Sequence, residues 1–442
     1  MSKWRRRSSS GEQSGRRNMP LFGHRPLQSR PSHSFRLRRS GIGLIILIGL
    51  ALIYLSYPSF QPLTRSLPAS LLTAVHLLKS WRNTQNDQGR WVSANDGLDP
   101  TFTISQSNLK YPPDVYPARM NPFKRSNATF VSLVRNQDID DMMMSMRTVE
   151  DRINRKFGYP WVFLNDEPFK REFKKSVRSM TRSQVFFGLI PKQHWSYPSF
   201  IDQSRAAQAR KLMGEANVVY GNSESYRHMC RYNAGFFFRH PLMLQFDYYW
   251  RVEPGIQYYC DLDYDPFLFM QANQKVYSFT VSLLEYQATI PSLWKTVQDF
   301  LHRNPGSMAT NNSLEFILAD PSKGMESDYN LCHFWSNFEL ADMRFWRSPI
   351  YEKFFDHIDQ SGGIFYERWG DAPIHSIAAA LFLKKEQIHQ WDDIGYYHHP
   401  FTHCPSDIKR FHLNGKCFCE PSESFDNQPY SCTPRWREIN DK

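Results

Sequence analysis

The distribution of apolar and polar positions divides the chain into four stretches. Residues 1–40 are polar and basic, and residues 41–57 form a run of uncharged, mostly apolar residues. Residues 58–120 are rich in Ser, Pro, Gln and Asn with little sustained periodicity, whereas from residue 121 to 442 short β-prone runs alternate with helical segments. The pattern therefore predicts a tail (1–40), a membrane-spanning segment (41–57), a stem (58–120) and one folded domain (121–442).

The folded domain is expected to open with a strand, a helix and a second strand. Residues 128–134 and 161–165 are β-prone, and the segment from about 138 to 156 has a helical pattern. Such a unit pairs its strands in parallel through a crossover helix. Further strands are predicted at 234–238, 246–252 and 276–283, and further helices at 204–214, 291–303, 349–358 and 372–385. This alternation predicts an α/β fold with a largely parallel central sheet.

Motifs and aromatic content narrow the class of ligand. No G-x-G-x-x-G follows the first strand and no G-x-x-x-x-G-K-[ST] occurs in the chain, which argues against a dinucleotide dehydrogenase and a P-loop enzyme. Aromatic residues make up 15% of the chain and, from residue 226 onward, cluster with carboxylates and amides. Because aromatic rings stack on sugars and nucleobases, this composition suggests a cleft for a carbohydrate or a nucleotide.

The apolar run 41–57 is interpreted as an uncleaved signal anchor. Its seventeen residues are near the lower limit for a membrane span. The basic head before it is too long for a cleaved signal peptide, and Leu55-Ser56-Tyr57-Pro58 is a poor cleavage site. The excess of positive charge before the run places the N-terminus in the cytoplasm and the folded domain in the lumen. We therefore expect a single-pass type II membrane protein, and the short span is typical of the thinner membranes of the early secretory pathway.

The net charge of +11 does not indicate a nucleic-acid partner. Eleven of the 54 Lys and Arg residues lie in the tail 1–40, together with only one of the 43 acidic residues. The rest of the chain is therefore nearly neutral, and the basic tail is expected to be cytoplasmic.

The seven cysteines are expected to form disulfides because the domain is predicted to be lumenal. Cys404, Cys417, Cys419 and Cys432 lie close together near the C-terminus, where two disulfides between them are favoured over a zinc site that would include His403. Cys230, Cys260 and Cys332 are scattered, and the odd total implies at least one free thiol. The pairing stays open. Two glycosylation sequons, at Asn127 and Asn311, agree with lumenal placement.

The aromatic run that begins at Tyr248 ends in Arg251, Val252, Glu253 and Pro254. It predicts a buried strand that delivers the Glu253 carboxylate to the rim of the sheet, where α/β enzymes hold metals and sugars. A structural salt bridge is the alternative interpretation of a single strand-end Glu.

A rival metal site is formed by Asp261, Asp263 and Asp265. The three carboxylates would share one face if the segment were a strand, and by spacing alone they are as good a candidate as Glu253. Capping of a neighbouring loop or contact with an acceptor is the alternative, so this triplet is the second choice.

Three long motifs carry a resemblance to a known family. They lie at Tyr248–Pro254, Tyr329–Glu339 and Glu367–Asp371, and the similarity extends over roughly residues 120–436. The chain resembles the fungal α-1,2-mannosyltransferases of glycosyltransferase family 15. This resemblance implies a GT-A type fold, GDP-mannose as donor, Mn²⁺, retention of the α configuration and a Golgi location.

The resemblance also implies roles for individual residues. Glu253 and His398 would be the protein ligands of the metal, and Glu339 would be the catalytic nucleophile or would stabilise an oxocarbenium-like sugar. Tyr226 and Arg251 are named from their chemistry alone, as an aromatic and a cationic side chain that are expected to contact the nucleotide or its diphosphate. Asp371 directly precedes a predicted helix, so it is expected either to bind an acceptor mannose or to cap that helix.

The expected activity is transfer of mannose from GDP-mannose to mannose-terminated glycans, in N-linked or O-linked protein glycosylation and cell-wall mannoprotein synthesis. The alternative is a lumenal lectin-like protein that binds mannose without transferring it. A lectin has no need of a donor-nucleotide fold, whereas the strand–helix–strand opening of this domain is typical of one.

Overall fold

The computed structural model describes residues 125–440. The predicted tail (1–40), membrane span (41–57) and stem (58–120) lie outside these residues, and their boundaries stay predictions. Among residues 125–440 there is no helix that is both long and apolar enough to cross a membrane.

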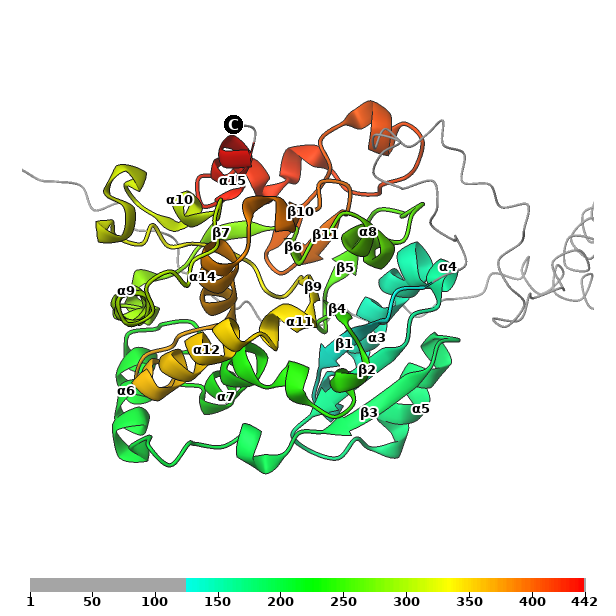
Figure 1. The fold of residues 1–442 in the computed structure, drawn as a ribbon. Coiled ribbons are helices and arrows are strands. Elements are labelled where there is room, and N and C mark those ends of the chain that lie inside the picture. The colour runs from blue at the N-terminus through cyan, green and yellow to red at the C-terminus, as the bar shows by residue number, and fades with distance from the viewer. Residues whose placement is uncertain (1–124, 441–442) are drawn as a thin grey trace, which may run out of the picture. The chain divides into compact units, whose positions relative to one another are not determined.

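A seven-stranded sheet forms the centre of the domain (Figure 1). Its order is β10-β6-β9-β4-β1-β2-β3, in which β9 runs antiparallel to both neighbours and every other pairing is parallel. The strands are β1 (Ala128–Leu133), β2 (Trp161–Asn165), β3 (Val185–Leu189), β4 (Tyr248–Arg251), β6 (Tyr277–Phe279), β9 (Leu340–Asp342) and β10 (Ile388–Gln390). The predicted α/β class with a mostly parallel sheet is confirmed.

Helices cover both faces of this sheet, so its strands are buried on both sides. Alternate residues of β1 and β4 enter two different hydrophobic clusters, as Phe130 and Trp250 do on one face and Val131 and Tyr249 on the other. The helices are α3 (Ile139–Val149), α4 (Arg155–Phe157), α5 (Arg171–Met180), α6 (Gln203–Glu215), α7 (Glu224–Gly235), α8 (Pro266–Ala272), α9 (Leu293–Arg303), α10 (Leu314–Ile317), α11 (Met343–Trp346), α12 (Pro349–Ser361), α13 (Gly363–Tyr366), α14 (Asp371–Phe382) and α15 (Thr433–Asn440).

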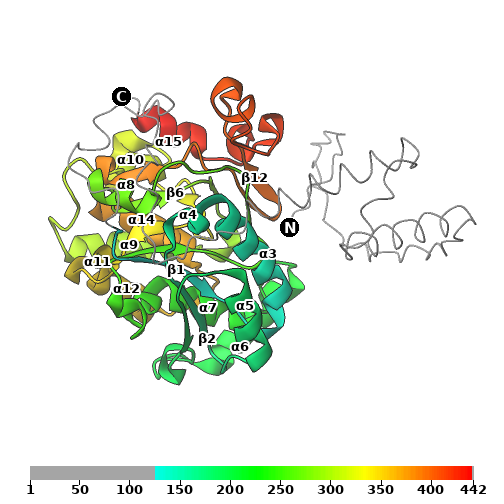
Figure 2. The same cartoon turned by 90° about the vertical axis from the view of Figure 1, so that its right-hand side faces the viewer.

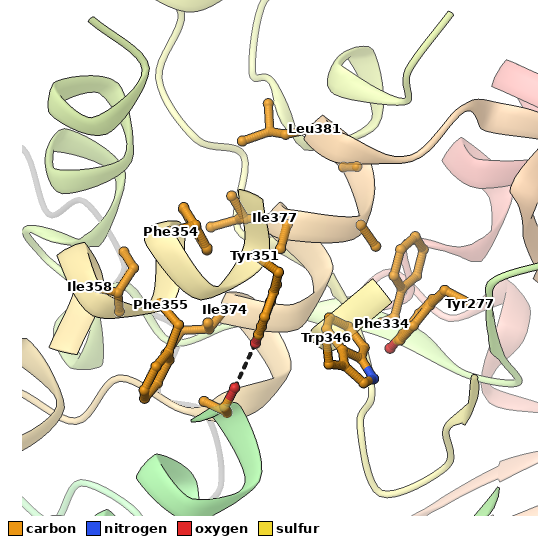
Figure 3. Packing of buried hydrophobic residues seen from close by; sticks show 14 of the residues in the cluster. Tyr277, Phe334, Trp346, Tyr351, Phe354, Phe355, Ile358, Ile374, Ile377 and Leu381 are labelled. Atoms are coloured by element: carbon orange, nitrogen blue, oxygen red, sulfur yellow. Dashed lines mark hydrogen bonds between the residues drawn. The ribbon is translucent and has the colours of Figure 1, made fainter. Parts of the chain in front are cut away.

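The face that bears the candidate site is covered by α7, α12 and α14. Figure 3 shows Phe354 and Ile358 of α12 packed with Ile374 and Ile377 of α14. The hydroxyl of Tyr351 donates a hydrogen bond of 2.7 Å to the carbonyl oxygen of Ala234 at the end of α7. The three helices therefore form one packed layer, which fixes α7 and the start of α14 relative to the sheet.

Two of the strand predictions differ from the structure. The segment 234–238 is not a strand, because it contains the end of α7 and a 3-10 turn, Phe237–Arg239. This segment is buried on several sides, so it lacks the apolar periodicity that distinguishes a helix. Gly235 is required there for close packing, since a Cβ atom at this position would lie 2.0 Å from Cε1 of Phe355.

The predicted strand 276–283 is in fact two strands. The chain leaves the central sheet after β6 and continues as β7 (Ser282–Leu284), which pairs antiparallel with β8 (Cys332–Phe334). The predicted helices at 138–156, 204–214, 291–303, 349–358 and 372–385 are confirmed within a few residues.

A small antiparallel sheet brings the C-terminal segment back to the end of β4. It consists of β5 (Gln257–Tyr258), β11 (Tyr396–His398) and β12 (Phe401–His403), in the order β12-β11-β5. Because β5 follows β4 after five residues, its pairing with β11 carries His398 to the carboxyl edge of the central sheet. Figure 2 shows this C-terminal part, in orange and red, folded onto the body of the domain.

Three disulfides hold this fold-back in place: Cys260–Cys417, Cys332–Cys432 and Cys404–Cys419. Disulfide chemistry was predicted, but of the two bridges expected within the C-terminal group only Cys404–Cys419 is present. The other two cysteines of that group pair with Cys260 and Cys332, because the chain after β5 and strand β7, the neighbour of β8, lie against the C-terminal segment. Cys230 is the free, buried thiol of the described residues.

Candidate active site

The Glu253 and His398 side chains meet at the carboxyl edge of the sheet. Glu253 lies two residues after β4, and its Oε2 atom is 3.3 Å from Nε2 of His398 at the end of β11. The two side chains are 24% and 27% exposed, so both are reachable from solvent. Two residues that are 145 positions apart in the chain are thus brought together by the β5–β11 pairing.

The neighbours of His398 fix the orientation of its ring. Its Nδ1 atom lies 3.0 Å from the carbonyl oxygen of His399. The edge of the ring packs against Trp335, with centroids 4.8 Å apart. Nε2 is therefore the ring nitrogen that faces the Glu253 carboxylate.

Arg251 lies behind this pair and connects it to α14. Its guanidinium donates to Glu253 through Nη2 and to Oδ2 of Asp371 through Nη1, the latter at 2.6 Å. Burial would raise the pKa of the Glu253 carboxyl, but the charge of Arg251 and the contact with His398 outweigh it and hold the pKa at about 2. Glu253 is therefore ionised throughout the physiological pH range.

Asp371 is the first residue of α14, yet its side chain does not cap that helix. No side-chain cap is formed at this terminus. The carboxylate instead accepts hydrogen bonds from Arg251 and from Oγ of Ser336, the latter at 2.8 Å. The capping interpretation is thus wrong, and Asp371 belongs to the same polar network as Glu253.

Glu339, directly before β9, is completely buried beneath Arg251. Its Oε2 atom accepts from the hydroxyl of Tyr249 at 2.8 Å. Its Oε1 atom accepts from the hydroxyl of Tyr277 at 3.0 Å and from Nδ1 of His375 at 2.7 Å. Burial, and then the Glu339 charge, raise the pKa of both tyrosines well above the ordinary value, so both stay protonated donors.

Tyr226, near the start of α7, lies in a second group of polar residues. Its hydroxyl accepts a 3.1 Å hydrogen bond from Nη1 of Arg368, whose Nη2 is 3.3 Å from Glu285. Burial raises the pKa of Tyr226 well above its ordinary value, and the negative charges of Asp371 and Glu285 act in the same direction. The Tyr226 ring also stacks on Tyr220, with centroids 4.6 Å apart.

The rival triplet does not converge on one point. Asp261 pairs with Arg152 at 3.0 Å and Asp263 with Lys416 at 2.7 Å. Asp265 caps α8 and accepts from the hydroxyl of Tyr159, and burial raises its pKa to about 6. Within residues 125–440 no group of three or more His, Cys, Asp or Glu side chains is arranged to hold a metal.

Comparison with known proteins identifies the family. A family model described as glycolipid 2-alpha-mannosyltransferase matches residues 86–441. This chain belongs to that family of α-1,2-mannosyltransferases.

Relatives and solved structures agree with this family assignment. The chain is 48% identical to the α-1,2-mannosyltransferase KTR1 of Saccharomyces cerevisiae over 86% of this chain and 95% of that protein. It is 46% identical to glycolipid 2-alpha-mannosyltransferase 1 of Candida albicans over 92% and 95%. The crystal structure of core-mannan synthase A from Aspergillus fumigatus in its Mn/GDP form is similar with a TM-score of 0.66 and 37% identity, over 74% of this chain and 87% of that one.

Glu253 and His398 are suited to a divalent cation in this mannosyltransferase. A carboxylate oxygen and an imidazole nitrogen lie 3.3 Å apart at a partly exposed edge of the sheet, so both can serve as ligands of one cation. Carboxylate oxygen and imidazole nitrogen are both accepted by Mn²⁺, and the partial exposure leaves room for further oxygen ligands. The donor set therefore fits a cation that takes its other ligands from a substrate or water.

The sequence interpretation missed several members of the site. Arg368 and Ser336 lie inside two of the three motifs that were recognised, so their positions were indicated although their contacts were not. His375 and Glu285 lie outside all three motifs, and no pattern in the chain distinguishes them from ordinary core or surface residues.

Proposed function

We propose that the protein transfers mannose from GDP-mannose to a mannose-terminated glycan, forms an α-1,2 linkage with retention of configuration, and requires Mn²⁺. The convergence of Glu253 and His398 at the carboxyl edge of the sheet is the observation that carries this proposal. It is supported by the Mn/GDP form of the core-mannan synthase and by the mannosyltransferase Ktr4p of Saccharomyces cerevisiae solved with GDP, which has 37% identity and a TM-score of 0.66 over 71% of this chain and 82% of that one.

In the proposed reaction Glu253 and His398 hold the cation and thereby position the donor diphosphate. When bound, Mn²⁺ neutralises the charge that develops on the departing diphosphate. Arg251 keeps Glu253 ionised and in place, and through Asp371 it joins the metal end of the site to α14. These contacts order the site before the substrate arrives, which lowers the cost of reorganisation during the reaction.

Glu339 is proposed to stabilise positive charge on the sugar. Both of its oxygens accept hydrogen bonds from buried side chains, which fix the carboxylate in position. A fixed, buried carboxylate acts strongly on a neighbouring oxocarbenium-like centre because the local dielectric constant is low. The fixed position of the Glu339 carboxylate therefore suits an electrostatic role.

Incubation of the purified full-length protein with GDP-mannose, Mn²⁺ and an α-mannoside tests this activity. We expect GDP release together with a product in which the new mannose is α-linked to O2, identified by linkage analysis and NMR. Chelation of Mn²⁺ with EDTA should stop the reaction, and added Mn²⁺ should restore it. Donor left intact under these conditions, or a β-linked product, would contradict the proposal.

We further propose a Golgi membrane location with the catalytic domain in the lumen and the acceptors among N-linked or O-linked protein glycans. Asn127 and Asn311 are exposed, so both sequons are accessible to glycosylation. The full-length protein expressed in a fungal cell should shift in mobility after deglycosylation, and the double variant Asn127→Gln and Asn311→Gln should not. An unshifted wild-type protein that also fails to co-fractionate with Golgi membranes would contradict lumenal placement.

A further inference from the structure

The helix α14 holds both ends of the site through two side chains on one of its faces. Asp371 and His375 are four residues apart, so they lie one turn from each other on the same side of the helix. Asp371 binds Arg251, which in turn contacts the proposed metal ligand Glu253. His375 instead donates from Nδ1 to Oε1 of Glu339 at 2.7 Å. The reaction described above gives a role to Asp371 but none to His375.

His375 is the donor to Glu339 that comes from outside the central sheet. The other two donors in the described structure, Tyr249 on β4 and Tyr277 on β6, both lie opposite Ala341 of β9, so they approach the carboxylate from the strands on either side. A carboxylate that is held only from these two sides can still turn about the line that joins the two hydroxyls. The imidazole of His375 approaches from the helix layer and prevents this rotation.

The His375 ring is itself held in one orientation. It is 0% exposed and stacks on Trp346, with centroids 4.1 Å apart and an angle of 20° between the planes. The same tryptophan donates from Nε1 to the hydroxyl of Tyr249 at 3.0 Å. The helix is fixed beside the ring, because Oγ of Ser376 accepts a 2.8 Å hydrogen bond from the backbone N–H of Phe334. Nε2 of His375 is buried without a partner among residues 125–440, so the ring acts on the site through Nδ1.

We propose that His375 is a positioning residue, which keeps the Glu339 carboxylate in the orientation that stabilises positive charge on the sugar. This inference rests on the proposed function, because the role of His375 follows from that of Glu339. Stabilisation of a transition state by a charge depends on distance and orientation, and a misplacement of about 1 Å can reduce a rate by about a hundredfold. Since His375 is fully buried and acts through Glu339, its loss should lower kcat without weakening the binding of GDP.

The variants His375→Leu and His375→Asn test whether the Nδ1–H donor is the group that the reaction requires. Leu fills a similar volume without a donor, whereas an amide N–H of Asn lies close to the position of Nδ1–H. We expect kcat of the full-length protein to fall about tenfold in His375→Leu, the effect of one lost hydrogen bond to a charged group, and His375→Asn to recover most of this loss. The inhibition constant of GDP with Mn²⁺ should stay unchanged in both variants.

A double-mutant cycle with Glu339→Gln separates positioning from a structural effect. If His375 acts through the Glu339 charge, His375→Leu should cause no further loss of kcat in the Glu339→Gln background. His403 offers the matched control, since it is also 0% exposed and contacts a buried carboxylate, that of Asp426, through Nδ1 at 2.9 Å. His403→Leu should change kcat by the same factor in both backgrounds.

Three outcomes would overturn the assignment. The same factor of loss from His375→Leu in both backgrounds would show that the imidazole only stabilises the fold, and a wild-type kcat in this variant would show that it has no effect on the reaction. Equal loss in His375→Asn and His375→Leu would show that the donated hydrogen bond is not what the reaction requires. Failure of the proposed function is separate, because it would appear as wild-type protein that leaves GDP-mannose intact.

Discussion

Replacement of Glu253 by Ala is expected to reduce Mn²⁺-dependent transfer by a factor of about a hundred to a thousand. The change removes the only carboxylate near His398 in the described structure, so it leaves an imidazole alone to hold the cation. His398→Ala should have a similar but smaller effect, because a charged oxygen contributes more than a neutral nitrogen to binding a hard divalent ion.

The measurement separates loss of metal from loss of fold. Initial rates at increasing Mn²⁺ should show a raised metal requirement in both variants, and thermal unfolding without metal should change little, since Arg251 keeps Asp371 as a partner. Asp263→Asn is the matched control. It removes a carboxylate of the rival triplet that pairs with Lys156 and Lys416, and it should leave the rate and the Mn²⁺ dependence unchanged. Normal Mn²⁺-stimulated turnover by the Glu253 variant would remove this residue from the site.

The half of the site that lies on β4 could be predicted from local pattern. An aromatic, β-branched run that ends in a carboxylate and a proline is a local signal, and Glu253 lies where that signal indicates. His398 could not be found in this way. Its position depends on the pairing of β11 with β5, a contact between residues far apart in the chain, and a histidine among tyrosines carries no such information.

The same distinction explains the errors in the fold. Helices with an amphipathic pattern, such as α9 and α12, were located correctly because one face of each is polar. Residues 234–238 are enclosed by α12 and the sheet, so their apolar run carries no period from which helix and strand could be distinguished. The pairing of Cys417 and Cys432 could not be predicted for a related reason, since their partners are set by tertiary packing and not by spacing.

Glu339→Gln is expected to lower kcat by about a hundredfold while the inhibition constant of GDP stays near the wild-type value. The amide keeps the shape of the side chain but removes the negative charge that is proposed to stabilise the sugar. In the variant, the NH₂ group of the amide would face a hydroxyl or imidazole donor that bonds to a carboxylate oxygen in the wild type. Because two donors cannot bond to each other, the protein should lose about 1–3 kcal/mol of unfolding free energy.

Loss of stability must therefore be separated from loss of catalysis, and Glu150 provides the matched comparison. It is a buried glutamate on the opposite face of the sheet, where its carboxylate accepts hydrogen bonds of 2.8 Å from Asn154 and from Trp161. Both donors bond to Oε1, so Glu150→Gln removes a buried charge while its carbonyl oxygen can keep both hydrogen bonds, and it should not lower kcat. The unfolding temperatures of the two variants show how much of any loss of kcat arises from lost stability. If the two variants lose kcat equally, or if Glu339→Gln turns over at the wild-type rate, the Glu339 charge has no part in the reaction. A loss of kcat confined to Glu339→Gln would instead show that this buried carboxylate acts on the transition state.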